Sequence, residues 1–408
     1  MDTIDLLIIG AGPAGLSTAM HLLQQDPSWA GRMLLLEKAK HPRPKLCGGG
    51  VTRLGLRYLR DLGFLMPLPI PQARVDDVRL QYGSRLIHAR GQPQFVIFHR
   101  PELDAYLAEQ ARQRGAVICE DEPALSFNVD AGGVTVTTSR KVYRSRVVVA
   151  ADGSKGIARQ VLSRGERRRR VARLLEALCA APESAPHFVE RYALMDFTQT
   201  KEGLQGYCWD FPARLSPEAV FGMSSPQAHW SLGPGSAGSS QQAHLDGIPA
   251  FNRGVYDARL EARRQRAHLP QLLDKFFIAN GGKMSDVVLE GHPIHWFSPL
   301  NRFAWPRLLL VGDSAGVDSL FGEGIAPALG YGQVAAQTIQ RAFTTGDYSF
   351  TDYRRRLLNS TVGRYLLQRW SVAEVCYRMG GQRWFMHLVW TIGDALAHLW
   401  PELPELYK

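Results

Sequence analysis

The sequence has few cysteines and no long apolar run. Its 408 residues include five cysteines, an odd number with none of the paired spacing of metal ligands. That pattern argues against a disulfide framework and favours a reducing compartment. No apolar stretch reaches the roughly 18 residues needed to cross a membrane, and the start of the chain lacks the basic residues of a targeting segment. We therefore expect a cytoplasmic protein that is either soluble or peripheral at a membrane surface.

Acidic residues are fewer than basic ones. The chain has 48 Lys and Arg against 38 Asp and Glu, and the net charge of +10 favours an anionic partner such as nucleic acid, lipid or a phosphorylated substrate. Part of the excess lies in one cluster, Arg164 with Arg167–Arg170. Charge runs are usually solvated, and no nucleic-acid recognition motif accompanies this one. We therefore expect no nucleic-acid partner.

A glycine-rich turn near the start of the chain predicts a dinucleotide site. The apolar run Leu6–Ile9 leads into GAGPAG and then into a helical pattern. In that context the glycines allow a tight turn in which the helix N-terminus approaches a pyrophosphate. The residues of this turn are Gly10, Gly12, Pro13, Ala14 and Gly15. A second match, GPGSAG at 233–238, has no buried strand before it and no helix after it, so we expect a loop there.

Three further features bear on the identity of the dinucleotide, and the last two favour FAD. Glu37 ends the next apolar strand and suits a free ribose hydroxyl, as in FAD or NAD, rather than the 2′-phosphate of NADP. Asp152 and Asp313 each follow an apolar strand, VVVAA and LLLVG, where Asp313 can accept a hydrogen bond from a ribityl chain. The segment GEGIAPA places Gly322 and Gly324 before a long helix, so the positive end of that helix can face the electron-rich edge of a flavin.

Taken in order, GAGPAG, KLCGGG, ADGSKG, GYCWDFP, VGDSAG and GEGI resemble the motifs of the geranylgeranyl reductase family of flavoproteins, within the group that shares the para-hydroxybenzoate hydroxylase fold. The resemblance spans Met1 to about Phe343. It implies FAD as cofactor and reduction of isolated carbon–carbon double bonds in a polyprenyl chain, either a small molecule or a lipid. The flavin contacts that it implies are Pro13, Ala14, Glu37, Cys47, Gly48, Arg100, the backbone near Ala124, Asp313, Gly324 and Ile325. Two residues depart from the family pattern, Leu204 in place of a proline and Tyr331 in place of a small residue, which leaves the preference for a substrate end group open.

The fold class that follows is α/β. We expect a discontinuous Rossmann-like FAD-binding domain, a second antiparallel-sheet substrate domain and a helical C-terminal region. The FAD-binding domain is expected to comprise residues 1–75, 100–165 and 292–345. The substrate domain is expected over residues 76–99 and 166–291, and the helical region over residues 346–408.

The stretch GYCWDFP predicts a strand that ends at Pro212. Alternation places Tyr207, Trp209 and Phe211 on one face and the two residues between them on the other. The pattern by itself is typical of a core strand, because aromatic residues favour strands and buried faces. The resemblance instead favours a substrate-binding wall opposite the flavin, in which Tyr207 and Trp209 align the alkene.

Cys47 lies in the loop KLCGGG, beside three glycines. A small cysteine is usually an inert packing residue, whereas the resemblance implies a thiol beside the flavin ring that delivers or orients a proton. The candidate catalytic residues are therefore Cys47, Tyr207 and Trp209.

Two other functions stay open at this point. A monooxygenase or halogenase would share the cofactor motifs, although halogenases show WxWxIP where this chain has Tyr207 and Phe211, and no lysine stands in an equivalent context. A non-catalytic flavin or prenyl-lipid binding protein could also keep every motif. The electron donor is open between NADPH and ferredoxin, because the chain has no second strand, GxGxxG and helix in succession.

Residues 383–400 predict an amphipathic helix. Its polar stripe is formed by His387, Thr391, Asp394 and His398. The pattern is more typical of a helix packed against its own protein than of a helix that lies in the plane of a membrane surface. Two histidines without an evident third ligand argue against a metal site, so we expect no metal.

Overall fold

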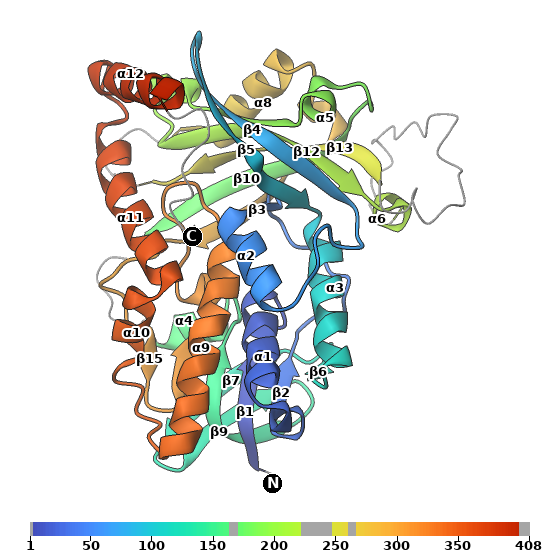
Figure 1. Cartoon of the computed structure of the whole chain (residues 1–408), viewed down its shortest axis with the longest axis vertical. Coiled ribbons are helices and arrows are strands. Elements are labelled where there is room, and N and C mark those ends of the chain that lie inside the picture. The colour runs from blue at the N-terminus through green and yellow to red at the C-terminus, as the bar shows by residue number, and fades with distance from the viewer. Residues whose placement is uncertain (1–2, 163–169, 222–246, 260–266, 400–408) are drawn as a thin grey trace.

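The computed structural model describes residues 3–162, 170–221, 247–259 and 267–399. Within these ranges the strands form two eight-stranded sheets, and helices pack against both of them (Figure 1). Most of the arginine cluster at 164–170, the segment GPGSAG at 233–238 and the side chain of His398 lie outside the described residues. Arg170, which is described, pairs with Glu374.

The first sheet holds the strands that carry the glycine and aspartate motifs. Its main path runs β15-β16-β9-β1-β2-β6, and β7 joins through β8, which pairs with β9. Its strands are β1 Thr3–Ile9, β2 Met33–Leu36, β6 Val117–Cys119, β7 Ala124–Asp130, β8 Gly133–Thr138, β9 Val142–Ala150, β15 Ala304–Trp305 and β16 Leu308–Leu310. Strands β16, β9, β1, β2 and β6 are parallel to one another, whereas β15 pairs with β16 antiparallel. Apolar runs without alternation, such as Leu6–Ile9, form these strands because helices cover the sheet.

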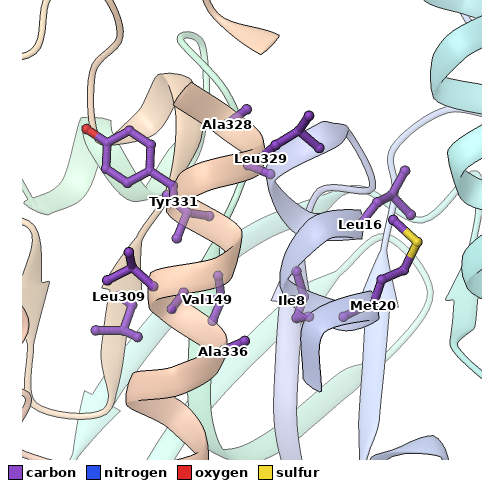
Figure 2. Close-up of a cluster of buried hydrophobic side chains, with 14 of the residues drawn as sticks. Ile8, Leu16, Met20, Val149, Leu309, Ala328, Leu329, Tyr331 and Ala336 are labelled. Carbon is purple, nitrogen blue, oxygen red and sulfur yellow. The ribbon is translucent and has the colours of Figure 1, made fainter. Parts of the chain in front are cut away.

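Two helices pack closely against the centre of this sheet. They are α1 Pro13–Gln25 and α9 Ile325–Thr345, which lie side by side in front of it (Figure 1). Figure 2 shows their apolar side chains between the helices and the strands, including Leu16 from α1, Leu329 from α9 and Ile8 from β1. The hydroxyl of Ser17 donates to the carbonyl of Leu329 at 2.7 Å, which ties the two helices together.

The parallel strands bring the sequence motifs to one edge. Strands β1, β2, β9 and β16 all end at this edge, and within three residues of their ends stand Gly10, Glu37, Asp152 and Asp313. In open sheets of parallel strands, ligands bind outside the carboxyl ends of the strands. The second sheet lies beyond this edge (Figure 1).

The second sheet has the order β14-β10-β13-β12-β11-β4-β5-β3 and is antiparallel except where β11 pairs with β4. Its strands are β3 Gly50–Thr52, β4 Gln72–Tyr82, β5 Arg85–Phe98, β10 Val171–Ala180, β11 Tyr192–Asp196, β12 Gly206–Leu215, β13 Ile248–Asp257 and β14 Glu290–His295. It also includes residues 50–52, 72–75 and 292–295, which the expected division assigns to the other domain, so the domain limits stay a prediction. The expectation that Pro212 ends its strand is wrong: β12 continues to Leu215, with Pro212 opposite Phe251 in the ladder.

The remaining helices flank the two sheets. They are α2 Arg53–Asp61, α3 Arg100–Gln113, α4 Ile157–Leu162, α5 Pro186–Val189, α6 Pro217–Phe221, α8 Leu269–Ala279, α10 Tyr353–Asn359, α11 Thr361–Met379 and α12 Arg383–Leu399. In Figure 1, α11 rises along one side of the molecule to α12, which lies against the second sheet. Met386 and Trp390 of α12 pack on Tyr82 and Ile87 of that sheet. None of the described helices has the length and apolar character that a membrane crossing requires.

The contact between α1 and α9 generates a stability prediction. A Cβ added at Gly332 of α9 would lie 2.5 Å from Oγ of Ser17 and 2.7 Å from the backbone N of Thr18. Replacing a helical Gly by Ala normally stabilises by about 1 kcal/mol, but overpacking costs about 1–3 kcal/mol, and the backbone of α1 cannot move aside. We expect Gly332→Ala to lower the free energy of unfolding by about 1–2 kcal/mol in urea titrations.

The matched control is Gly31→Ala, where an added Cβ meets nothing within 4 Å. This control should unfold at the wild-type urea concentration. An unchanged midpoint for Gly332→Ala would show that the two helices have room to separate.

Candidate functional site

The GAGPAG turn has the geometry of an anion-binding turn. Gly10 has φ +105°, and an added Cβ there would lie 2.3 Å from the carbonyl oxygen of Ala151. An added Cβ at Gly15 would lie 2.0 Å from the carbonyl oxygen of Gly10. The N-cap of α1 is Gly12, which makes no side-chain cap bond, so no side chain takes up the first amides of the helix. These features fit the pyrophosphate of a dinucleotide.

Glu37 lies at the end of β2, beside this turn, and is buried. Its Oε2 accepts a hydrogen bond from the backbone N of Ala11 at 2.9 Å. Arg43 lies over the same turn, with Nε 3.3 Å from Oε1 of Glu37, and sequence reasoning missed it. The contact of Glu37 with a ribose hydroxyl stays a prediction.

The two aspartates after the apolar strands differ in environment. Asp152 is turned toward the start of α4: its Oδ2 accepts from the backbone N of Ala158 at 2.9 Å, and burial raises its pKa to about 6. Asp313 lines a large cavity between the two sheets, called the main cavity below. Its Oδ2 lies 3.7 Å from Nζ of Lys45. Burial acts to raise the pKa of Asp313, but the nearby positive charges, Lys45 first, outweigh it and hold the pKa below its usual value. Asp313 is therefore an anion at neutral pH.

A cavity of about 1740 Å³ separates the motif edge of the first sheet from the second sheet. This volume exceeds the usual 300–1,000 Å³ of a small-molecule pocket, so it has room for both a flavin ring and a long apolar substrate. Of the predicted site residues, it is lined by Cys47, Gly48, Arg100, Tyr207, Trp209, Phe211, Asp313, Gly322 and Gly324. The other predicted site residues are not part of the cavity lining, and their contacts with the cofactor stay predictions. They are Gly10, Gly12, Pro13, Ala14, Gly15, Glu37, Ala124, Asp152 and Ile325.

The three aromatic residues of β12 form one wall of the cavity. Tyr207, Trp209 and Phe211 are each buried, and consecutive ring centroids along the row are 6.2 Å apart. The hydroxyl of Tyr207 donates to the carbonyl of Phe321 at 2.6 Å. The indole Nε1 of Trp209 donates to Oδ1 of Asn252 at 2.8 Å. Their polar atoms are thus satisfied by the protein, and the ring faces are left for apolar contact.

The position of the Trp209 ring depends on a glycine in the neighbouring strand. Gly254 lies opposite Trp209 in the β12–β13 ladder, and an added Cβ there would lie 2.2 Å from the indole ring. On the other face of β12, Asp210 forms an ion pair with Arg253 at 2.9 Å. The alternation expected from the sequence therefore holds, with rings toward the cavity and the charged pair behind the sheet.

The backbone of Cys47 is held by two side chains of the second sheet. Its N–H donates to Oε1 of Glu176 at 2.9 Å, and its carbonyl accepts from Nδ2 of Asn252 at 3.2 Å. Burial raises the pKa of the Cys47 thiol, and the charge of Glu176 adds to this effect. Arg100 opposes it but is itself paired with Asp104, with two hydrogen bonds of 2.9 Å. The thiol is consequently neutral at physiological pH.

Four residues around the site had no recognisable signal in the sequence, because they converge only through strand register and loop conformation. Lys45 and His292 line the cavity, and Glu176 and Asn252 hold the backbone of Cys47 from behind. Nζ of Lys45 lies 3.1 Å from Nε2 of His292, and burial, followed by the charge of Lys45, lowers the pKa of His292 to about 4. Lys45 lines the cavity, and the expectation that no lysine stands in a context equivalent to that of the halogenases stays a prediction.

The two departures from the family pattern lie away from the cavity wall. Leu204 packs in the cluster of apolar side chains around α8. Tyr331 of α9 is fully buried beside the first sheet, as Figure 2 shows, and its hydroxyl donates to the carbonyl of Gly316 at 2.9 Å. Neither side chain therefore shapes the space offered to a substrate.

Comparison with known proteins identifies the family of this chain. The FAD binding domain family model matches residues 3–216. The chain is 23% identical over 404 residues to the digeranylgeranylglycerophospholipid reductase of Thermoplasma acidophilum, covering 92% of this chain and 88% of that protein.

Two solved structures share the fold. One is a geranylgeranyl bacteriochlorophyll reductase-like protein from Thermoplasma acidophilum, with a TM-score of 0.71, 21% identity and coverage of 92% of this chain and 88% of that one. The other is the halogenase PltM, with a TM-score of 0.65, 16% identity and coverage of 98% and 83%. The chain belongs to the FAD binding domain family and is an FAD-dependent oxidoreductase similar to the geranylgeranyl reductases.

Proposed function

We propose that this protein saturates isolated carbon–carbon double bonds of a polyprenyl substrate. The observation that carries the proposal is the shared cavity: Cys47, Asp313 and Gly324, the N-cap of α9, line it together with Tyr207, Trp209 and Phe211. The first group comes from the motifs that resemble flavin contacts. The second group offers ring faces to an apolar chain. A prenyl segment between them would meet both the cofactor and the aromatic wall.

The chemistry requires a hydride and a proton, and the bound cofactor, reduced FAD, supplies the hydride. An isolated alkene has no carbonyl group that a charged residue could polarise, so the protein contributes alignment and exclusion of water. The aromatic wall holds the chain without directional contacts. The Cys47 thiol, kept neutral by its raised pKa, carries a proton into the cavity. The electron donor in this proposal is NADPH or ferredoxin.

The rim of the cavity favours a substrate with an anionic head group. Arg57 and Arg60 of α2 and Arg74 of β4 line the cavity and are exposed. Because they are both exposed and part of the lining, they lie where the cavity opens to solvent. An apolar interior with guanidinium groups at its mouth is complementary to a prenyl chain that ends in a phosphate or diphosphate.

The helix α12 supports contact with a lipid surface. Trp384, Leu388 and Ile392 are spaced by four residues on one side of α12 and are 59%, 47% and 50% exposed. Val372 of α11 is also exposed and lines the cavity, so an exposed apolar side chain lies at the entrance. The net charge of +10 favours anionic lipid. We therefore propose an anionic membrane surface as the partner of this face.

The monooxygenase or halogenase alternative shares the fold, and Lys45 places an amine in the cavity. That amine lies between Asp313 and His292, where it neutralises a buried carboxylate. The alternative predicts oxygen-dependent consumption of NADPH with a hydroxylated or halogenated product. A protein that binds flavin and prenyl lipid without reacting predicts no reoxidation of the reduced protein by any prenyl compound.

Removal of the Trp209 ring should separate catalysis from cofactor binding. We expect Trp209→Ala to retain FAD and to lose at least about tenfold in the rate at which geranylgeranyl diphosphate reoxidises the reduced protein under anaerobic conditions, because the alkene loses its alignment. Stopped-flow absorbance of the flavin gives the rate, and mass spectrometry detects the gain of two hydrogens. Trp384→Ala, outside the cavity, is the matched control. An unaltered rate in Trp209→Ala would remove the wall from the mechanism.

Loss of charge at the rim should act on substrate affinity. We expect the double variant Arg57→Gln and Arg60→Gln to raise KM for geranylgeranyl diphosphate about tenfold, since each exposed pair contributes about 0.2–1 kcal/mol, and to leave KM for geranylgeraniol unchanged. The effect should shrink as salt is added. Arg140→Gln, on an exposed turn of the first sheet, is the control. Equal changes for both substrates would exclude a head-group role.

Polar substitution on α12 should weaken membrane contact without harming the site. We expect the double variant Leu388→Ser and Ile392→Ser to lose most co-sedimentation with vesicles that contain anionic phosphatidylglycerol, because each change removes apolar area from the bilayer contact. Val189→Ser is the control, since Val189 is 70% exposed on a different helix, α5. Wild-type protein that fails to bind these vesicles would refute the proposed partner.

A further inference from the structure

A small side cavity lies behind the Cys47 loop. Its volume is about 40 Å³, which is enough for a water molecule, since one water needs about 10–15 Å³ of such space and two to four polar partners. Its polar lining comes from Lys45, His99, Arg100, Glu176 and Asn252. Cys47 lines both this side cavity and the main cavity, so the two spaces meet at the thiol loop.

Glu176 has one carboxyl oxygen engaged and one without a protein partner. The residue is 6% exposed, and its Oε1 accepts from the backbone N of Cys47 at 2.9 Å. Its Oε2 is buried and has no hydrogen-bond partner among the described residues. A buried carboxylate oxygen without a partner is costly. The cost falls when the oxygen carries a proton, when a water binds it, or both.

The surroundings of Glu176 raise the pKa of its carboxyl group. Burial is the largest effect and raises its pKa to about 7, and Glu290 on the neighbouring strand β14 raises it further. The hydrogen bond from the backbone N–H of Cys47, the side-chain amide of Asn252 and the charge of Lys45 act in the opposite direction but do not outweigh burial. His292 on β14 is neutral at this pH, and Arg100 at the start of α3 is engaged by Asp104. Near neutrality a substantial fraction of Glu176 is therefore protonated.

The order of proton affinities allows transfer toward the thiol. The pKa of the Cys47 thiol is raised above its usual value of 9.0, whereas the pKa of Glu176 is about 7. A Cys47 thiolate is thus the stronger base, and a proton moves from Glu176 to it with a favourable free energy. The nearby guanidinium of Arg100 lowers the cost of the thiolate while it exists.

We propose that Glu176 is the proton reserve of the site and resupplies Cys47 through a water in the side cavity. This inference rests on the proposed function. One alkene carbon would receive the hydride that reduced FAD supplies when bound, and the thiol of Cys47 gives its proton to the other carbon, leaving a thiolate. The thiolate takes a proton from the water, the water takes one from Glu176, and the Glu176 carboxylate takes one from solvent. Glu176 does not line the main cavity, so it is a positioning residue that acts through Cys47.

The first test measures the proton on Glu176 without any turnover. Infrared spectra of the oxidised holoenzyme, recorded from pH 5 to pH 9, should contain a carboxylic-acid band that disappears with a midpoint near 7 in wild-type protein. The band should be absent in Glu176→Gln and present in Glu290→Gln. Glu290 is the matched control because it lies opposite Glu176 in the β10–β14 ladder and is exposed. A Glu176 that stays ionised down to pH 5 would overturn the proposal.

The second test measures the effect on chemistry with geranylgeranyl diphosphate as the probe. Protonated Glu176 is present below its pKa and is lost as pH rises, so the wild-type rate of anaerobic flavin reoxidation over repeated turnovers should fall above about pH 7. In Glu176→Gln, kcat at pH 6.5 should fall at least about tenfold and lose this pH dependence, while KM and the dithionite reduction of the flavin stay unchanged. Glutamine can still accept the bond from Cys47, so a purely structural role predicts a near-normal kcat.

The outcomes of the two tests separate this inference from the function on which it rests. A wild-type protein that reduces no prenyl compound refutes the proposed function, and the infrared titration then still decides whether Glu176 holds a proton. A near-normal kcat in Glu176→Gln, or a wild-type rate that does not change between pH 6 and pH 8, refutes the proton reserve even if prenyl reduction is observed.

Discussion

The site depends on one short chain of hydrogen bonds that joins a glycine-rich loop to the second sheet. Glu176 and Asn252 bind the N–H and the carbonyl of Cys47, and Asn252 also accepts from the indole of Trp209. A loop with three glycines has little conformational preference of its own. These bonds give it one position, with the thiol loop and the aromatic wall held against each other. The distance between Cys47 and the aromatic row of β12 is thereby set by side chains of β10 and β13.

Buried charges in the cavity occur in groups that offset one another. Lys45 lies beside Asp313 and His292, and Arg100 is engaged by Asp104. Pairing of this kind lowers the desolvation cost of each ion and leaves most of the cavity wall apolar. Glu176, behind the Cys47 loop, is held differently, because its hydrogen bond comes from a backbone N–H rather than from a cation. Burial therefore raises its pKa.

The same fold serves proteins named as reductases and as halogenases, so the arrangement of helices and sheets does not determine the reaction. The side chains that face the cavity must therefore carry the argument for the reaction. Rings from β12 face a neutral thiol, and arginines lie at the rim. These are the contacts on which the proposed polyprenyl reduction rests, and a different wall on the same scaffold would favour a different substrate.

The amino-acid sequence by itself determined the parts of the protein that depend on neighbours along the chain. The glycine turn, the aspartates after apolar strands and the alternation of Tyr207, Trp209 and Phe211 are local patterns, because a strand repeats every two residues and a tight turn needs glycine where φ is positive. The expected end at Pro212 failed for a reason that is not local, since β12 lies between two other strands and continues past the proline.

Tertiary structure decided which distant residues meet. Glu176 and Asn252 lie on neighbouring strands, and Gly254 opens the space that the indole of Trp209 occupies, yet no spacing along the chain indicates that these residues converge on Cys47. Likewise, the sequence of α12 predicts packing on its own protein, but only the position of that helix shows that Met386 and Trp390 are buried while Trp384, Leu388 and Ile392 are exposed. The physical reason is that strand register and helix placement minimise the free energy of the whole core, to which each local segment contributes only a part.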